Sequence, residues 1–270
     1  MPEAAGLYYE LHGPEDGEPL ILSSGLGGSA SYWQPNVDAF AERFRVILYD
    51  HRGTGRSDRA LPDKVSIEDM AADVIALLDA IGIERVHFVG HAIGGMIGMA
   101  MALAHRTRMR RLMVINGWAK LEPHSGRCFD ARLQLLHAGG PAAFAAAQSI
   151  FLYPADWIAM HEAQVAEQVQ ATINHFPGIG TMEKRIAAAR GFDILDRIGE
   201  IVPPLLAICA NDDVLVPSIA SSRIVDRLSP FNGGTEVTMR WGGHACNVTD
   251  PDSFNPFAFA WLAGQPLIEE

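Results

Sequence analysis

The chain has 270 residues, of which 49% are hydrophobic and 20% are charged. This length fits one large domain that carries an insertion, and this composition excludes a disordered chain. The formal net charge of −11, from 21 basic and 32 acidic residues, argues against nucleic acid and against an anionic membrane surface as partners.

The N-terminus and the cysteines indicate the cellular setting. Residues 1–13 are mixed and acidic, unlike a secretory signal, and no stretch is expected to span a bilayer. Cys128, Cys209 and Cys246 are scattered and show no C-x-x-C spacing. We therefore predict a cytoplasmic protein with no disulfide framework, no metal and no cofactor.

Strand and helix signals alternate in the first part of the chain. Apolar residues recur at helical spacing over 67–81, and Ser66 with Asp69 can cap the start of that helix. Apolar runs typical of strands lie at 20–22, 44–49, 86–89, 112–116, 205–210 and 235–239. This alternation predicts an α/β fold with a mostly parallel central sheet and helices on both faces.

The pattern changes between residues 117 and 197, where no strong strand signal appears. Helices are predicted there at 133–137, 141–151, 156–171 and 182–190, with one more near 252–262 after the strands resume. We predict a core domain formed by residues 1–116 and 198–270, and a helical cap formed by residues 117–197.

Residues 86–96 resemble the nucleophile elbow of an α/β-hydrolase, in which a strand turns sharply into a helix. The elbow motif is G-x-S-x-G, and here it reads Gly90-His91-Ala92-Ile93-Gly94. Ala92 replaces the serine, and a methyl group cannot attack a carbonyl. A glycine-rich strand-to-helix turn of a nucleotide-binding type of fold is the alternative when the motif is taken alone.

An earlier glycine-rich loop, residues 23–28, follows the strand at 20–22. α/β-hydrolases build the first half of the oxyanion hole at this place, so the backbone N–H groups of Leu26 and Ile93 are predicted as its two donors. Ser24 stands where the family usually has histidine. The plain alternative is a turn after a strand.

Asp213 and His244 complete the order elbow, aspartate, histidine that is typical of the α/β-hydrolase triad. Asp213 follows the strand at 205–210, and His244 follows two glycines in a loop. We predict that Asp213 holds one ring nitrogen of His244 and leaves the other facing the pocket. Asp212 is interpreted as a turn residue. A solvated aspartate and a structural histidine are the alternatives.

Other residues are weaker candidates. The loop 49–58 resembles the family's D-x-R-G-x-G-x-S-D segment, and we expect Arg52 and Ser57 to brace loops there rather than to act in catalysis. Side chains predicted to line the substrate pocket, or else to pack in the core or cap, are Trp33, Trp118, Tyr153, Trp157, Arg127 and, more weakly, Asn116. Cys246 and Cys128 are the poorer alternatives for a nucleophile.

Longer segments identify the chain as similar to the RutD-type proteins of bacterial pyrimidine degradation. The segments that carry the resemblance include residues 24–33, 116–118, 127–129, 151–157 and 242–251. The resemblance implies uracil catabolism. It also implies hydrolysis of carbamate to ammonia and carbon dioxide, or of aminoacrylate to malonic semialdehyde and ammonia.

These observations together predict a hydrolase of a small C–N bonded substrate. His244, held by Asp213, would act on water or directly on the substrate, with no covalent nucleophile. The alternatives are a non-catalytic ligand-binding protein and a cofactor-free lyase or oxygenase. The expected partner is a small molecule, and a homodimer is the default assembly.

Overall fold

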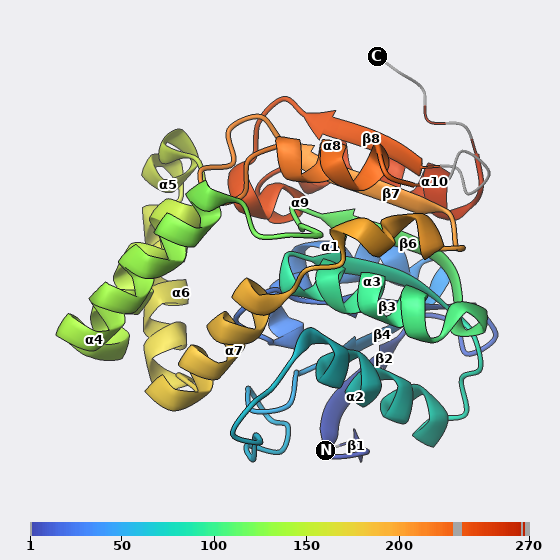
Figure 1. Ribbon diagram of the computed structural model, residues 1–270, viewed down its shortest axis with the longest axis horizontal. Coiled ribbons are helices and arrows are strands. Elements are labelled where there is room, and N and C mark those ends of the chain that lie inside the picture. The colour runs from blue at the N-terminus through green and yellow to red at the C-terminus, as the bar shows by residue number, and fades with distance from the viewer. Residues whose placement is uncertain (1, 229–233, 266, 268–270) are drawn as a thin grey trace.

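A single eight-stranded sheet forms the centre of the molecule in the computed structural model, which describes residues 2–228, 234–265 and 267 (Figure 1). The strand order is β1-β2-β4-β3-β5-β6-β7-β8. The pairs β1–β2 and β2–β4 are antiparallel and the others are parallel. The strands are β1 (Glu3–Ala4), β2 (Leu7–His12), β3 (Glu18–Ser23), β4 (Phe44–Tyr49), β5 (Val86–His91), β6 (Met109–Ile115), β7 (Leu205–Ala210) and β8 (Gly234–Met239).

Helices cover both faces of the sheet, so the predicted α/β fold class is confirmed (Figure 1). Helices α2 (Ile67–Ala80), α3 (Ile93–Ala104) and α8 (Ile219–Val225) contribute to the larger core cluster. Helices α1 (Gln34–Ala41) and α10 (Pro251–Leu262) pack together in the second cluster, and the short α9 (Cys246–Thr249) contributes Cys246 to it. Ser66 and Asp69 form the predicted capping box at the start of α2.

A group of helices lies between β6 and β7 in the chain and stands beside one end of the sheet (Figure 1). These helices are α4 (Pro123–Leu152), α5 (Ala155–Met160), α6 (Glu162–Asn174) and α7 (Ile179–Gly191). The expected helix over 156–171 is two helices, because the chain leaves helical geometry at His161. The division into a core and a cap at residues 117 and 197 stays a prediction.

One helix differs from expectation in length. By length and composition alone, α4 could cross a membrane, although the sequence predicts no such stretch. Gly140 breaks the helix with a φ of 69°, and Pro141 follows it, so α4 consists of two shorter segments. Leu136 and Phe144, on either side of the break, are buried in the larger core cluster. The helix thus has a packing role within the fold.

The sequence analysis does not predict the strands β1 and β2 or several short helices that the structure contains. Residues 1–13 look mixed and acidic, yet β2 pairs antiparallel with β4 and buries Leu7 completely. The strand predicted to end at Asn116 ends instead at Ile115, and Asn116 has a φ of 48°. β2 lies between the two-residue β1 and β4, and this half-buried strand shows too few apolar positions to be recognised from composition.

The turn from β5 into α3 requires close backbone contact. A Cβ added to Gly94 would lie 2.1 Å from the carbonyl oxygen of Ser23 and 2.8 Å from that of Ser24. Backbone atoms at that distance cannot move aside as a flexible side chain would. Only glycine therefore allows the first turn of α3 to pack against the loop that follows β3.

We predict that Gly94→Ala lowers the free energy of unfolding by more than about 3 kcal/mol, because the new methyl meets rigid backbone. The control is Gly180→Ala in the exposed first turn of α7, where an added Cβ has no neighbour within 4 Å. That variant is expected to stay within about 1 kcal/mol of the wild type. Urea unfolding followed by circular dichroism measures both, and a Gly94→Ala protein as stable as the control would contradict the packing argument.

Candidate active site

Ala92 keeps the backbone conformation of a nucleophile elbow without its nucleophile. Its φ is 49° and its ψ is −113°, a region that residues with a Cβ rarely adopt. Its backbone N–H donates to the Ile115 carbonyl at 2.8 Å, which ties the elbow to the end of β6. The side chain is 5% exposed. The strained turn therefore persists although its usual occupant is absent.

His244 and Asp213 form a buried pair. His244 Nδ1 lies 2.8 Å from Asp213 Oδ2, and both side chains are almost completely shielded from solvent. Asp213 Oδ1 accepts the backbone N–H groups of Leu215 and Val216 at 2.7 and 2.9 Å. The carboxylate thus holds a proton on Nδ1 and presents Nε2, which has no hydrogen-bond partner among the described residues, as the free ring nitrogen.

Asp212 lies in a turn, as expected, but its side chain bonds another loop. Its two oxygens accept the backbone N–H groups of Gly242 and Gly243 at 3.2 and 2.9 Å. Two neighbouring aspartates therefore hold the loop that carries His244, one through its backbone and one through its imidazole. This double attachment fixes the position of the ring.

His91 links the elbow to the loop that carries Gly242, Gly243 and His244, named here the histidine loop. Its Nε2–H donates to the His244 carbonyl at 2.8 Å, and its ring stacks on Tyr32 and meets the His244 ring edge-on. Burial, together with the nearby His244, holds the pKa of His91 well below its ordinary value, so the ring is neutral. Because Nε2 carries the proton, Nδ1 is an acceptor, and none of the described residues donates to this buried atom.

Asn116 is a second support for the same carbonyl. Its Nδ2 donates to the His244 oxygen at 2.7 Å, from the residue that directly follows β6. The left-handed backbone of Asn116 turns the side chain toward the histidine loop, a conformation that asparagine tolerates better than most residues. Asn116 is thus a structural anchor of His244.

The two predicted oxyanion donors lie on segments that meet at the elbow. Within the described residues the Leu26 N–H has no acceptor, and the Ile93 N–H opens α3, where no earlier helical carbonyl can accept it. A Cβ added to Gly25 would lie 2.9 Å from His91 Nδ1 and 3.5 Å from the Ala92 methyl. The loop therefore packs directly against the elbow.

The aromatic candidates have structural partners. Trp33 is fully buried in the second core cluster, and Trp118 donates from Nε1 to the Ala189 carbonyl on α7 at 3.3 Å. Tyr153 packs against Trp157 and donates its hydroxyl to Gln168 Oε1 at 2.9 Å. Whether these side chains contact a substrate stays a prediction.

Arg127 lies on the exposed surface and donates only to the Pro123 carbonyl of its own helix. The structure does not bring it to His244, because the exposed side of α4 carries it. Two other arginines of this region, Arg132 and Arg185, are buried instead. The sequence gives no signal that separates a buried arginine from an exposed one on an amphipathic helix.

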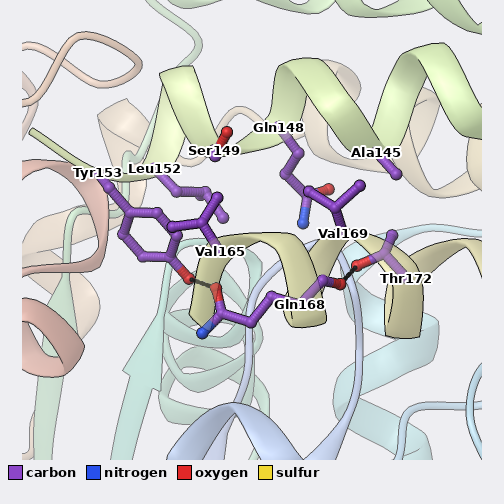
Figure 2. Close-up of a pocket in the computed structure, with 9 residues that line it drawn as sticks. All are labelled: Ala145, Gln148, Ser149, Leu152, Tyr153, Val165, Gln168, Val169 and Thr172. Atoms are coloured by element: carbon purple, nitrogen blue, oxygen red, sulfur yellow. Dashed lines mark hydrogen bonds between the residues drawn. The ribbon is translucent and has the colours of Figure 1, made fainter. Parts of the chain in front are cut away.

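A small pocket lies in the helical region between β6 and β7, between α4 and α6 (Figure 2). Figure 2 shows the Tyr153 hydroxyl meeting Gln168 at one end and the Thr172 hydroxyl meeting the Gln168 carbonyl at the other. Val165 and Leu152 add apolar lining. Neither His244 nor Ala92 lines this pocket, so it is separate from the dyad.

The cysteines are poor replacements for the serine. Cys246 is completely buried near Asn116, and burial raises the pKa of its thiol far above the ordinary value. Burial also raises the pKa of the Cys128 thiol, which lies against the Val214 carbonyl. Thiols that stay protonated are weak nucleophiles. Among the described residues, no cluster of three or more potential metal ligands occurs.

The loop 49–58 braces the structure, as expected. Ser57 donates to the Asp50 carbonyl at 2.6 Å and accepts the Tyr8 N–H at 2.9 Å, so its hydroxyl is fully occupied. Arg52 pairs with Asp73 on α2. Neither side chain is free for catalysis.

The importance of Tyr32, His91 and Arg185 is not evident in the sequence alone. His91 lies inside the elbow motif, and its position before the missing serine is the one signal that could have marked it. Tyr32, beyond stacking on His91, donates its hydroxyl to Asn247 beside the histidine loop. That contact joins residues more than 200 positions apart, which local patterns cannot reveal.

We predict that Asn116→Ala and Asn116→Gly both lower the free energy of unfolding by about 1–3 kcal/mol, because each leaves the buried His244 carbonyl with one donor fewer. Asn116→Ala should be the less stable of the two by about 1 kcal/mol. In left-handed backbone the alanine Cβ crowds the neighbouring carbonyl oxygen, and glycine has no Cβ. Thermal unfolding of both variants checks this, and an alanine variant more stable than the glycine variant would refute it.

Comparison with known proteins shows the family of this chain. The α/β hydrolase fold family matches residues 18–251. A protein of Variovorax paradoxus named "Putative carbamate hydrolase RutD" is 49% identical over 95% of this chain and 96% of its own length. A protein of the same name from Agrobacterium fabrum is 44% identical over 92% and 95% of the two chains.

Solved structures give the same result for the fold. A hydrolase of Pseudomonas aeruginosa has a TM-score of 0.85 at 26% identity, covering 95% of this chain and 94% of its own. The enol-lactonase of Burkholderia xenovorans has a TM-score of 0.85 at 25% identity, covering 95% and 96%. The chain belongs to the α/β hydrolase fold family and, within it, to the RutD family.

Proposed function

We propose that this hydrolase releases ammonia from a small carbamate anion in pyrimidine utilisation, through the His244–Asp213 pair and without a covalent nucleophile. One observation carries the proposal: His244 is held at 2.8 Å by a buried carboxylate beside an elbow whose central residue is alanine. The names of the RutD relatives support carbamate as the substrate.

A proton donor alone is enough for carbamate. Protonated His244 gives its Nε2 proton to the carbamate nitrogen, whose lone pair forms the new N–H bond. The C–N bond then breaks, its electron pair stays on the departing ammonia, and the carboxylate becomes carbon dioxide. His244 regains a proton from solvent, so the step needs no nucleophile at position 92.

The other residues hold the two reacting groups in place. The N–H groups of Leu26 and Ile93 would bind a carboxylate oxygen beside the elbow, and the positive end of α3 favours an anion there. Asp213 stabilises the positive charge on the imidazole before transfer. Acid–base help of this kind is typically worth about 10²–10⁴-fold, which suits a substrate that also decays unaided.

Aminoacrylate is the alternative substrate implied by the resemblance. Protonation of its carbon would give an iminium ion that water attacks, so the same imidazole would serve. A non-catalytic ligand-binding protein has less support, because pure binding has no evident need for a carboxylate that fixes a histidine tautomer. A small-molecule substrate, a homodimer and a cytoplasmic location remain predictions.

We predict that His244→Ala and Asp213→Asn each reduce ammonia release from freshly prepared carbamate to the buffer rate. Asp213→Asn keeps an oxygen for the Leu215 and Val216 amides but loses the charge that stabilises the imidazolium, so it should fold normally. The wild type should exceed the buffer rate by about 10²-fold or more. Stopped-flow detection of ammonia, with carbamate and aminoacrylate in parallel, makes the measurement.

Arg127→Ala is the control, because its side chain lies on the surface and touches only its own helix. It should match the wild type. Wild-type rates equal to the buffer rate with both substrates would refute the catalytic proposal and leave a binding role.

We predict that Ala92→Ser restores a covalent nucleophile. The backbone already adopts the elbow conformation, so the added hydroxyl should lower stability by less than about 1 kcal/mol. Mass spectrometry after treatment with a fluorophosphonate should show one adduct on residue 92. The double variant Ala92→Ser with His244→Ala should remain unlabelled, and labelling that is independent of His244 would contradict the site.

A further inference from the structure

Arg185 is a completely buried arginine of α7 that contacts the glycine-rich loop of residues 23–28, which we name the oxyanion loop. Its Nε donates to the Leu26 carbonyl at 3.0 Å, and its Nη2 donates to the Gly25 carbonyl at 3.4 Å. A Cβ added to Gly28 would also lie 2.9 Å from Nη2. The guanidinium thus lies against the inner side of the loop that carries the Leu26 N–H.

The charge of Arg185 has no counter-ion. Among the described residues no carboxylate oxygen lies within 4 Å of it, whereas the loop arginine Arg56 pairs with Asp50. Burial lowers the pKa of Arg185 to about 10, which leaves the group positively charged at neutral pH. Its Nη1 is buried and has no hydrogen-bond partner in the part of the chain that the structure describes. An unpaired buried cation is unfavourable unless something else compensates it.

The residues behind Arg185 are neutral. Nη2 donates to His51 Nδ1 at 3.0 Å, and burial together with Arg185 holds the pKa of His51 well below its ordinary value. His51 Nε2 then lies 3.3 Å from the Ser23 hydroxyl, which bonds the Tyr49 hydroxyl. Burial raises the pKa of Tyr49 far above its ordinary value, so no anion forms there. Among the described residues, therefore, the hydrogen-bond partners of Arg185 are neutral carbonyls and a neutral imidazole.

The geometry of one peptide group shows where the charge of Arg185 acts. The Gly25 carbonyl and the Leu26 N–H belong to the same planar peptide unit and point in opposite directions. Arg185 holds the carbonyl side, so the N–H side faces away from α7. A cation on the carbonyl oxygen also polarises the peptide and strengthens its N–H as a donor. Because Gly25 packs against His91 and Ala92, the Leu26 N–H lies next to the elbow.

We propose that Arg185 and the Gly25–Leu26 peptide make the oxyanion loop a binding site for small monovalent carboxylate-class anions, and that Arg185 selects them over neutral molecules of the same shape. Arg185 is a positioning residue, since it acts through the loop. The inference rests on the proposed function, because it places the substrate's carboxylate at the Leu26 amide. Its test measures binding and not turnover.

The test compares acetate with acetamide, two molecules of similar shape that differ in charge. Each is titrated into ¹⁵N-labelled protein at constant ionic strength, and the shift of the Leu26 amide gives the Kd. In the wild type, acetate should move the Leu26 proton downfield in a saturable way and acetamide should not. Arg185→Met should weaken acetate binding by about tenfold, because the Gly25–Leu26 peptide loses the cation that polarises it and the anion loses a nearby positive charge.

Arg132→Met is the matched control. Arg132 is a buried arginine of α4 whose pKa burial also lowers to about 10, and its guanidinium lies over the rings of Phe129, Phe144 and Phe151. It makes no contact with the oxyanion loop, so acetate should bind this variant as it binds the wild type. Arg185→Lys keeps the charge but cannot reach both carbonyls, and should weaken acetate binding several-fold.

An unchanged acetate Kd in Arg185→Met would overturn the inference, as would a wild type in which acetate leaves the Leu26 amide unmoved. If Arg185→Met does not fold, Arg185→Lys decides, and an acetate Kd and Leu26 shift equal to those of the wild type would overturn it. Carbamate turnover without acetate selectivity would count against this inference alone. Acetate selectivity without turnover would count against the proposed function alone.

Discussion

The hydrogen bond from His244 Nδ1 to Asp213 is the interaction on which the account depends. This hydrogen bond fixes the tautomer of His244. Separate hydrogen bonds to the backbone of the same loop fix the position of the ring. His91 and Asn116 both donate to the His244 carbonyl, while Asp212 accepts from the two glycines before it. Elements from β5, β6 and β7 thus meet at one residue. Several hydrogen bonds that converge on one backbone segment restrict its movement.

The missing serine becomes intelligible once the chemistry is considered. An ester or amide needs an attacking group, and so the usual elbow serves a nucleophile. A carbamate anion needs only a proton on nitrogen to fall apart into ammonia and carbon dioxide. In the proposed reaction the Leu26 and Ile93 N–H groups would still bind the substrate carboxylate, although alanine occupies position 92. Ala92 keeps a strained backbone, and such strain persists only where the surrounding structure maintains it. The elbow is therefore preserved although its side chain has changed.

The sequence could predict those parts of the fold that depend on patterns among neighbouring residues. The capping box of Ser66 and the buried strands of the parallel sheet follow from short-range patterns. The order of elbow, aspartate and histidine follows from the resemblance to the α/β-hydrolase triad. The pairing of β2 with β4 and the burial of Arg185 do not, because they depend on partners distant in the chain. Arg127 and Arg185 look alike in sequence, and packing alone decides that one is exposed and the other buried. The contact of Asn116 with the His244 carbonyl depends on the left-handed backbone of Asn116, whose φ is 48°, and this conformation is not evident in the sequence.

A crystal structure of the protein with bicarbonate, a close mimic of carbamate, tests the central claim most directly. The account predicts one carboxylate oxygen within about 3 Å of both the Leu26 and the Ile93 amide nitrogens, with the hydroxyl that replaces the amino group within hydrogen-bond distance of His244 Nε2. Bicarbonate bound away from the elbow, or bound there with His244 Nε2 out of reach, would contradict it.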